Sequence, residues 1–211
     1  MPPFDPASEL ASLRKLTSVC NQGKPAAFGA FNKVLAKLLH LTIMKPDGHL
    51  TLQGLEGGRG RAQKLIRGSK GPIPLRDGRF LRLTISLYIE PTEKGPRFKT
   101  WQSSFQYQKD FDGKDWIFRY DYLRAPEGSY PSAHVQVRGQ HERIHFPTMR
   151  VPFEAIIRCL ANDFNVPCHA PKEVWRYILH QGASSNKFER EVSTWRPSEG
   201  KARTSGNSRG A

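Results

Sequence analysis

The sequence predicts an α+β protein with one core, in which an antiparallel sheet of about four strands is flanked by N-terminal and C-terminal helices and followed by a disordered C-terminal tail. Two observations support this class: apolar residues recur at helical spacing near both ends of the chain, and they alternate with polar residues in the middle. The 211 residues, 37% of them hydrophobic, are enough to form one compact core.

Two helices are predicted before residue 40. The first begins at Ser8, which can cap it, and ends before Gly23 and Pro25; its apolar stripe is Leu10, Leu13, Leu16 and Val19. The second has an apolar stripe at Phe31, Val34, Leu35, Leu38 and Leu39. A small hairpin is then predicted around Asp47 and Gly48, between the β-prone runs 41–44 and 49–52.

Residues 57–82 differ sharply in composition from the rest. They contain eight basic residues against the single acid Asp77, so they contribute +7, half of the net charge of +14. Six glycines and two prolines disfavour a regular helix. We therefore expect an exposed, flexible loop that enters a strand near Arg79.

Four strands are predicted after this segment, at about 80–89, 98–107, 116–123 and 134–137, with a turn at Asp112 and Gly113. Helical spacing returns at 153–164 and again at 174–179. Past Gly182 few large apolar groups remain, which predicts disorder over 182–211. The expected organisation is helices and hairpin over 1–56, basic loop, sheet and helices over 57–181, and the tail.

The excess of Lys and Arg favours nucleic acid as the partner, with RNA preferred over DNA. A high charge that only maintains solubility and attraction to an anionic membrane surface are the alternatives. Three cysteines at irregular spacing, Cys20, Cys159 and Cys168, predict reduced thiols in a cytoplasmic protein. No apolar run suggests secretion or a membrane span, and no motif predicts a metal site or a cofactor.

A candidate catalytic group consists of Arg119, Asp121, His134 and His145. In a strand, Arg119 and Asp121 point to the same face, where they could pair beside His134 across a hairpin. Two histidines and an arginine provide what metal-independent RNA cleavage needs: a proton acceptor, a proton donor and a cation for the phosphoryl charge. The alternative is that both histidines make ordinary hydrogen bonds and that Arg119–Asp121 is a surface ion pair.

The stretch from about Leu81 to Phe164 resembles the TumE-type toxin family of prokaryotic toxin–antitoxin modules. The matching motifs are Phe118–Arg119–Tyr120–Asp121, then Pro131 to His134, then His145–Phe146–Pro147 before the helix at Phe153. The chain offers only His134, His141 and His145 where the family has a dense histidine cluster. The resemblance implies a growth-inhibiting protein that acts on RNA and is held by an antitoxin.

The Gly-rich basic loop supplies the candidate nucleic-acid-binding residues Arg59, Arg61, Lys64, Arg67 and Lys70. Small residues let the backbone approach phosphates, and arginine forks bind them. A solvated linker that binds nothing is the alternative.

Three functional hypotheses follow. The first is a nucleic-acid-directed protein acting as a toxin-like, metal-independent ribonuclease. The second is a non-catalytic RNA- or DNA-binding module. The third is a protein–protein adaptor for an acidic partner such as an antitoxin, with the sheet or Trp175–Tyr177 as its contact surface.

Overall fold

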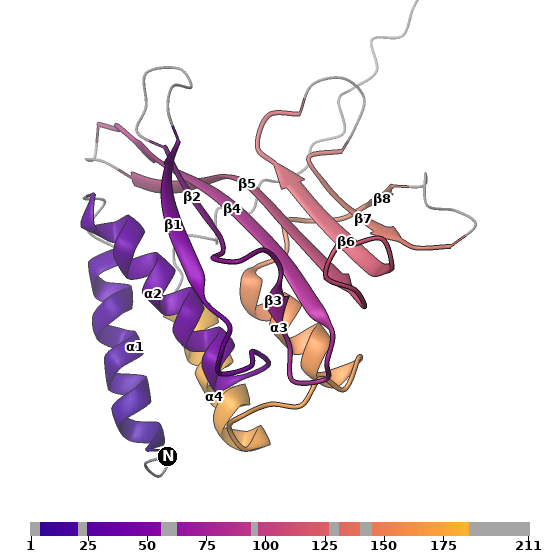
Figure 1. Cartoon of the computed structure of the whole chain (residues 1–211). Helices are drawn as coiled ribbons and strands as arrows, with labels where there is room; N and C mark the ends of the chain where they lie inside the picture. Colours follow the sequence, from indigo (N-terminus) through magenta and orange to yellow (C-terminus); the bar gives the residue numbers. More distant parts are fainter. Residues whose placement is uncertain are drawn as a thin grey trace, which may run out of the picture.

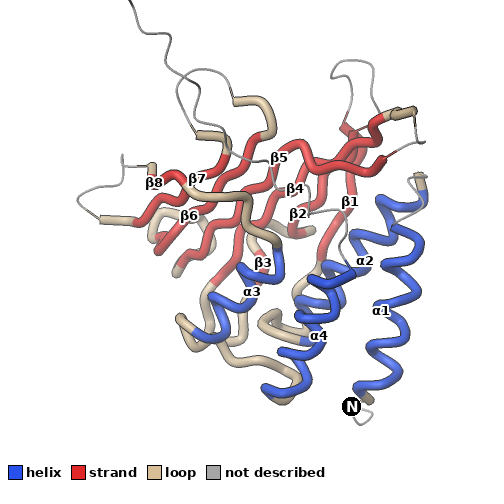
Figure 2. The backbone as a smooth tube through the Cα atoms, turned by 180° about the vertical axis from the view of Figure 1, so that it is seen from behind, coloured by secondary structure: helices blue, strands red, loops and turns tan. Residues whose placement is uncertain are grey.

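A computed structural model describes residues 5–20, 25–55, 63–93, 97–126, 131–139 and 145–185. Over these residues the chain is α+β, with four helices and one antiparallel sheet of eight strands. The helices gather against one face of the sheet, and the two opposite views agree on this arrangement (Figures 1 and 2). The class is as predicted, but the prediction of about four strands is wrong, because three strands precede the predicted set and one follows it.

The helices are α1 (Pro6–Cys20), α2 (Ala26–Leu41), α3 (Phe153–Asn162) and α4 (Lys172–Ser185). Helix α1 begins before Ser8, because Asp5 Oδ1 accepts a hydrogen bond of 3.0 Å from the Ala7 backbone N–H and Pro6 presets the first helical turn. Within the described ranges, no helix is both long and apolar enough to cross a bilayer.

The strands are β1 (Leu50–Leu55), β2 (Gln63–Gly68), β3 (Ile73–Pro74), β4 (Phe80–Glu90), β5 (Arg97–Gln108), β6 (Trp116–Leu123), β7 (Ala133–Val137) and β8 (Phe146–Pro147). Their order is β1-β2-β4-β5-β6-β7-β8, and β3 pairs with β4 outside this path. The four predicted strands are confirmed as β4 to β7. Gly113, in the predicted turn between β5 and β6, has a φ of 81°, a conformation that favours glycine.

The predicted hairpin around Asp47 and Gly48 is wrong. Leu41 ends α2 instead of starting a strand, because it is buried with the rest of that helix's apolar stripe. Strand β1 pairs with β2, from Leu50 opposite Gly68 to Leu55 opposite Gln63. The β-prone residue Met44 makes one isolated bridge, to Leu75.

The prediction that residues 57–82 form a loop is wrong for the part that the structure describes. Strand β2 lies between β1 and β4 and pairs with both. Partners on both sides satisfy its backbone, so tertiary pairing overrides the glycine content. Ile66 is buried and Arg67 is exposed, as alternation requires. Residues 57–62 of the segment lie outside the described residues.

The predicted tail boundary at Gly182 is also wrong, because α4 continues through Ser185. One glycine inside a helix costs only about 1 kcal/mol relative to alanine, which does not stop a helix anchored by the buried Trp175 and Leu179. The rest of the predicted tail lies outside the described residues.

Aromatic packing joins the sheet to the helix layer. The Phe105 ring of β5 lies 5.9 Å from that of Tyr120 on β6 and 5.6 Å from that of Phe153 on α3, measured between centroids. All three side chains are buried. The face that carries Phe105 and Tyr120 is therefore the covered face, and we call the opposite face of the sheet the open face.

Phe105→Ala should lower the free energy of unfolding by about 3–5 kcal/mol, because it removes a ring from this closed aromatic contact and leaves a cavity. Denaturant unfolding measures the change. Met149→Ala is the control, since that side chain is 75% exposed and should change stability by less than about 0.5 kcal/mol. Equal effects in the two variants would contradict the assignment of the core.

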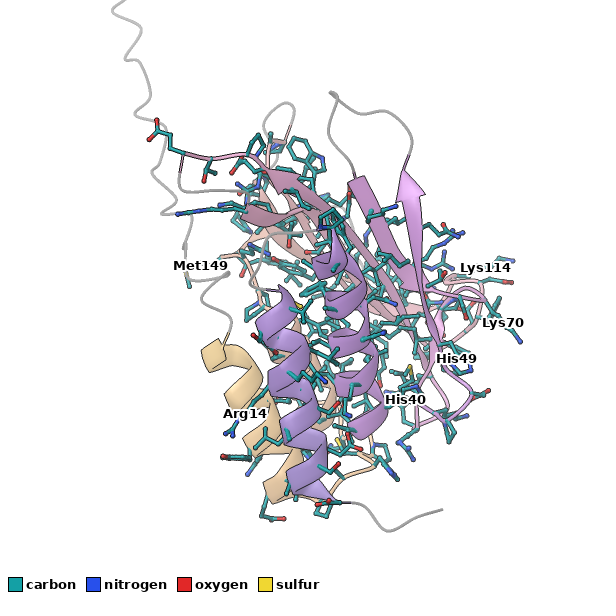
Figure 3. All side chains as sticks on the ribbon, turned by 90° about the vertical axis from the view of Figure 1, so that its left-hand side faces the viewer. Arg14, His40, His49, Lys70, Lys114 and Met149 are labelled. Atoms are coloured by element: carbon teal, nitrogen blue, oxygen red, sulfur yellow. The ribbon has the colours of Figure 1, made fainter. Side chains whose placement is uncertain are left out.

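Four basic side chains lie near one another at the C-terminal end of α2: His40, His49, Arg76 and His169. The rings of His40 and His49 are 6.3 Å apart and lie close together in Figure 3. Burial, followed by the positive neighbours His49, Arg76 and His169, lowers the pKa of His40 below its ordinary value of 6.5. The folded protein therefore binds a proton at His40 more weakly than the unfolded chain does.

Protonation of His40 should destabilise the fold. The contribution of neutral His40 to the free energy of unfolding is complete above about pH 6.5. This contribution is lost as the pH falls through the lowered pKa of His40 in the folded state. His40→Gln should remove this part of the pH dependence. Chemical denaturation at about pH 7.5 and about pH 5 compares the two proteins, and identical pH dependence would contradict the prediction.

Candidate active site

Strand β6 sends alternate side chains to opposite faces of the sheet, and this alternation creates the site. Tyr120 is only 1% exposed and packs toward the helices. Arg119 and Asp121 therefore lie on the open face, as the sequence predicts. Asp121 pairs in register with His134 of β7, and Arg119 pairs with Gln136.

His145 reaches the same place from the segment just before β8. In the β7–β8 ladder, Val135 pairs with Phe146 and His134 pairs with Pro147. The imidazole centroids of His134 and His145 are 4.5 Å apart. The structure thus brings together two histidines that are eleven positions apart in the sequence.

The chain after β8 is tied to the core behind the site. The Thr148 backbone N–H donates to the Ala133 carbonyl at 3.0 Å. The Val151 backbone N–H donates to the Tyr120 hydroxyl at 2.8 Å. Tyr120 therefore orients β6 by its burial and holds the segment that follows His145 by its hydroxyl group.

A chain of polar contacts connects three of the four side chains, Arg119, Asp121 and His134. Arg119 Nε lies 2.7 Å from Asp121 Oδ2, and His134 Nε2 lies 3.8 Å from the same oxygen. Asp121 thus stands between a guanidinium and an imidazole.

Two further contacts orient the imidazoles. His134 Nδ1 faces the Pro131 carbonyl oxygen at 3.3 Å, which leaves Nε2 directed toward Asp121. The Gln136 side-chain amide nitrogen lies 3.0 Å from His145 Nε2. Gln136 is two residues after His134, so both side chains lie on the same face of β7. This short strand therefore carries His134 and also the residue that contacts His145.

These side chains line a pocket of about 420 Å³ on the open face. Its other walls come from β5 and from Pro126 and Pro131, which lie on either side of the β6–β7 connection. The volume is within the range of small-molecule sites and is large enough for a nucleotide-sized group. All four predicted catalytic residues contribute to the lining.

Other catalytic chemistry finds less support in the described residues. The three thiols are free, and burial raises the pKa of Cys20, Cys159 and Cys168 to about 11. They are therefore protonated and poorly nucleophilic near neutral pH. Over the described ranges, no three His, Cys, Asp or Glu side chains form a group that could hold a metal ion.

Only Lys64, Arg67 and Lys70 of the predicted nucleic-acid-binding residues belong to the part of the chain that the structure describes. Arg59 and Arg61 lie outside the described residues. Lys64 and Arg67 are three positions apart on β2, so alternation places them on opposite faces, with Arg67 on the open face. Lys70 lies in the turn before β3 and projects on the same side of the molecule as Lys114 (Figure 3).

Sequence reasoning missed some residues and misplaced others. Gln136 was not singled out, although it could have been found from its spacing of two from His134. Within the surface suggested for a protein partner, Trp175 is 4% exposed and belongs to the core, whereas Tyr177 is 49% exposed. Trp175 is therefore not available as a contact residue.

Comparison with known proteins adds no relative: the chain matches no protein-family model, no curated protein and no solved structure. The resemblance to TumE-type toxins and the antitoxin partner that it implies remain predictions.

Arg119→Gln should change the free energy of unfolding by less than about 1 kcal/mol, because an ion pair whose arginine is 46% exposed is screened by solvent. Thermal or denaturant unfolding provides the measurement. A loss of several kcal/mol would show that Arg119 is a structural residue and would weaken its assignment to the pocket's chemistry.

Proposed function

We propose that this protein cleaves RNA by acid–base catalysis in the pocket on the open face. The observation that carries the proposal is the pair of imidazoles of His134 and His145, 4.5 Å apart, in a pocket that also contains Arg119. Both rings line the same pocket, so a phosphodiester bound there would lie beside both. Near neutral pH, histidine can act as proton donor or as proton acceptor.

The reaction needs no nucleophile from the protein, because RNA carries its own. One imidazole accepts the proton of the ribose 2′-hydroxyl while the 2′-oxygen bonds to the adjacent phosphorus. The bond from phosphorus to the 5′-oxygen breaks, and the other imidazole, as imidazolium, donates a proton to that oxygen. The products are a 2′,3′-cyclic phosphate and a 5′-hydroxyl, and a second proton exchange with water restores the histidines.

Arg119 and Asp121 have supporting roles in this scheme. The Arg119 guanidinium stabilises the charge that develops on the phosphoryl oxygens. Asp121 holds that guanidinium at 2.7 Å and lies 3.8 Å from His134 Nε2, so it positions both groups. Asp121 is a positioning residue, since its carboxylate would repel a phosphate that approached it directly.

One feature favours RNA over DNA as the substrate. The scheme depends on the 2′-hydroxyl, which DNA lacks. The net charge of +14 attracts a polyanion to the protein but does not distinguish the two nucleic acids. The 2′-hydroxyl therefore decides the preference for RNA over DNA, and the positive charge attracts either nucleic acid to the protein.

His134→Ala should lower kcat on single-stranded RNA by at least about 100-fold, the loss expected when one general acid or base is removed. RNA affinity and the far-ultraviolet circular dichroism spectrum should stay unchanged. His145→Ala should have an effect of the same order. Gel analysis of end-labelled RNA, with DNA of the same sequence alongside, measures the rates.

His49→Ala is the matched control, because His49 is an exposed histidine that lies beside His40 and does not line the pocket (Figure 3). It should keep full activity. The wild-type cleavage rate should show a bell-shaped dependence on pH. His134→Ala and His145→Ala should each remove one limb of that pH–rate curve. Intact RNA after incubation with the wild-type protein, with or without added divalent metal, would refute the proposal.

A further inference from the structure

Two adjacent rows of polar side chains cross the open face and end at the pocket. The paired registers join the first row across five strands: Arg67, Thr84, Ser104, Asp121 and His134. The second row runs beside it, two residues away on each strand: Arg82, Gln106, Arg119 and Gln136. Neither row contains Phe, Tyr or Trp.

The arginines in these rows are exposed, unlike the side chains on the covered face. Arg67, Arg82 and Arg119 all have exposed side chains on β2, β4 and β6. Between them stand neutral hydrogen-bonding groups, those of Thr84, Ser104 and Gln106. The only acid of the two rows is Asp121, and Arg119 pairs with it. The surface leading to the pocket is therefore positive and polar.

Arg82 is held in place by the turn between β5 and β6. Its Nη2 donates to the Asp112 carbonyl oxygen at 3.1 Å and lies 3.5 Å from that of Phe111. A guanidinium has five N–H donors, so these contacts through one nitrogen leave others for a phosphate. Because the contacts are to neutral carbonyl groups, they fix the position of the side chain without neutralising its charge.

The rows are long enough for a stretch of nucleic acid. Neighbouring strands lie about 4.8 Å apart, so the distance from Arg67 on β2 to His134 on β7 is about 19 Å over four intervals. This length accommodates several nucleotides of an extended single strand. Proteins that bind single strands without sequence preference use a positive groove that follows the backbone.

We propose that the open face binds single-stranded RNA through its sugar–phosphate backbone, with Arg67 and Arg82 holding nucleotides beyond the scissile phosphate. The proposal rests on the proposed function, because it extends the substrate from the pocket across β5, β4 and β2. The arginines contact phosphates, and the hydroxyl and amide groups between them can hydrogen-bond to ribose 2′-hydroxyls. The two rows contain no Phe, Tyr or Trp that could stack on bases. They therefore bind the sugar–phosphate backbone and do not distinguish between base sequences.

The test compares Arg67→Gln and Arg82→Gln with Arg14→Gln. Arg14 is exposed on α1 and lies on the opposite side of the molecule from Lys70 and Lys114 (Figure 3), so its replacement removes the same charge away from the open face. Binding of a fluorescent RNA of about eight nucleotides is measured in the His134→Ala background, which prevents cleavage. Kinetics are measured in the active protein with this RNA and with a dinucleotide.

Each open-face substitution should weaken binding of the longer RNA by about 3–10-fold at low salt. It should also reduce the slope of log affinity against log salt by about 0.7, the value for one phosphate contact on a single strand. In the active protein, KM for the longer RNA should rise while kcat, and the rate with the dinucleotide, stay unchanged. Arg14→Gln should match its parent protein in every assay.

The outcomes separate this inference from the proposed function. If the wild-type protein cleaves no RNA but Arg67→Gln and Arg82→Gln weaken binding, the ribonuclease proposal falls and the binding rows stand. If both variants bind RNA as tightly as their parent, or if Arg14→Gln weakens binding equally, the proposal that the open face binds RNA is overturned. This holds whether or not cleavage occurs.

Discussion

The burial of Tyr120 is the constraint on which the candidate site depends. Its ring stacks on Phe105 and its hydroxyl group accepts the Val151 N–H, so it must face the helices. Because strand side chains alternate with a period of two, this single requirement sends Arg119 and Asp121 to the open face. A slip of one residue in the β6 register would bury both charges and expose the aromatic ring, at a large cost in free energy.

The same constraint separates stability from function. The covered face holds the aromatic and aliphatic core against α3 and the other helices, whereas the open face carries polar side chains that the core does not need. Substitutions in the pocket should therefore change chemistry more than stability. This division makes the proposed catalytic and binding variants informative, because they should fold.

The charge on the open face suits the polyanionic substrate that we propose. The rows across the open face contain three exposed arginines and one acid, and that acid pairs with Arg119 beside His134. An ion pair of this kind adds little to stability at a surface, but it holds a guanidinium at a defined position. Asp121 therefore has a clearer role in positioning groups in the pocket than in holding the fold together.

Much of the central sheet could be predicted from the sequence, since β4 to β7 have long, regular alternation and clear turns. The same alternation placed Arg119 and Asp121 on one face and next to His134. Strand β2 could not be found in this way, because its glycine and basic residues resemble a loop until neighbouring strands satisfy the backbone. The predicted hairpin failed because Leu41 serves the buried stripe of α2.

Local pattern thus determined which side chains share a face, because the two-residue period of a strand is a property of the chain itself. Only the tertiary structure decided which faces meet and what lies beside them. His145 joins His134 through the pairing of β7 with β8, and Arg67 joins the rows of the open face through the pairing of β2 with β4. Strand order depends on how the whole apolar surface is buried, and no short stretch of sequence contains that information.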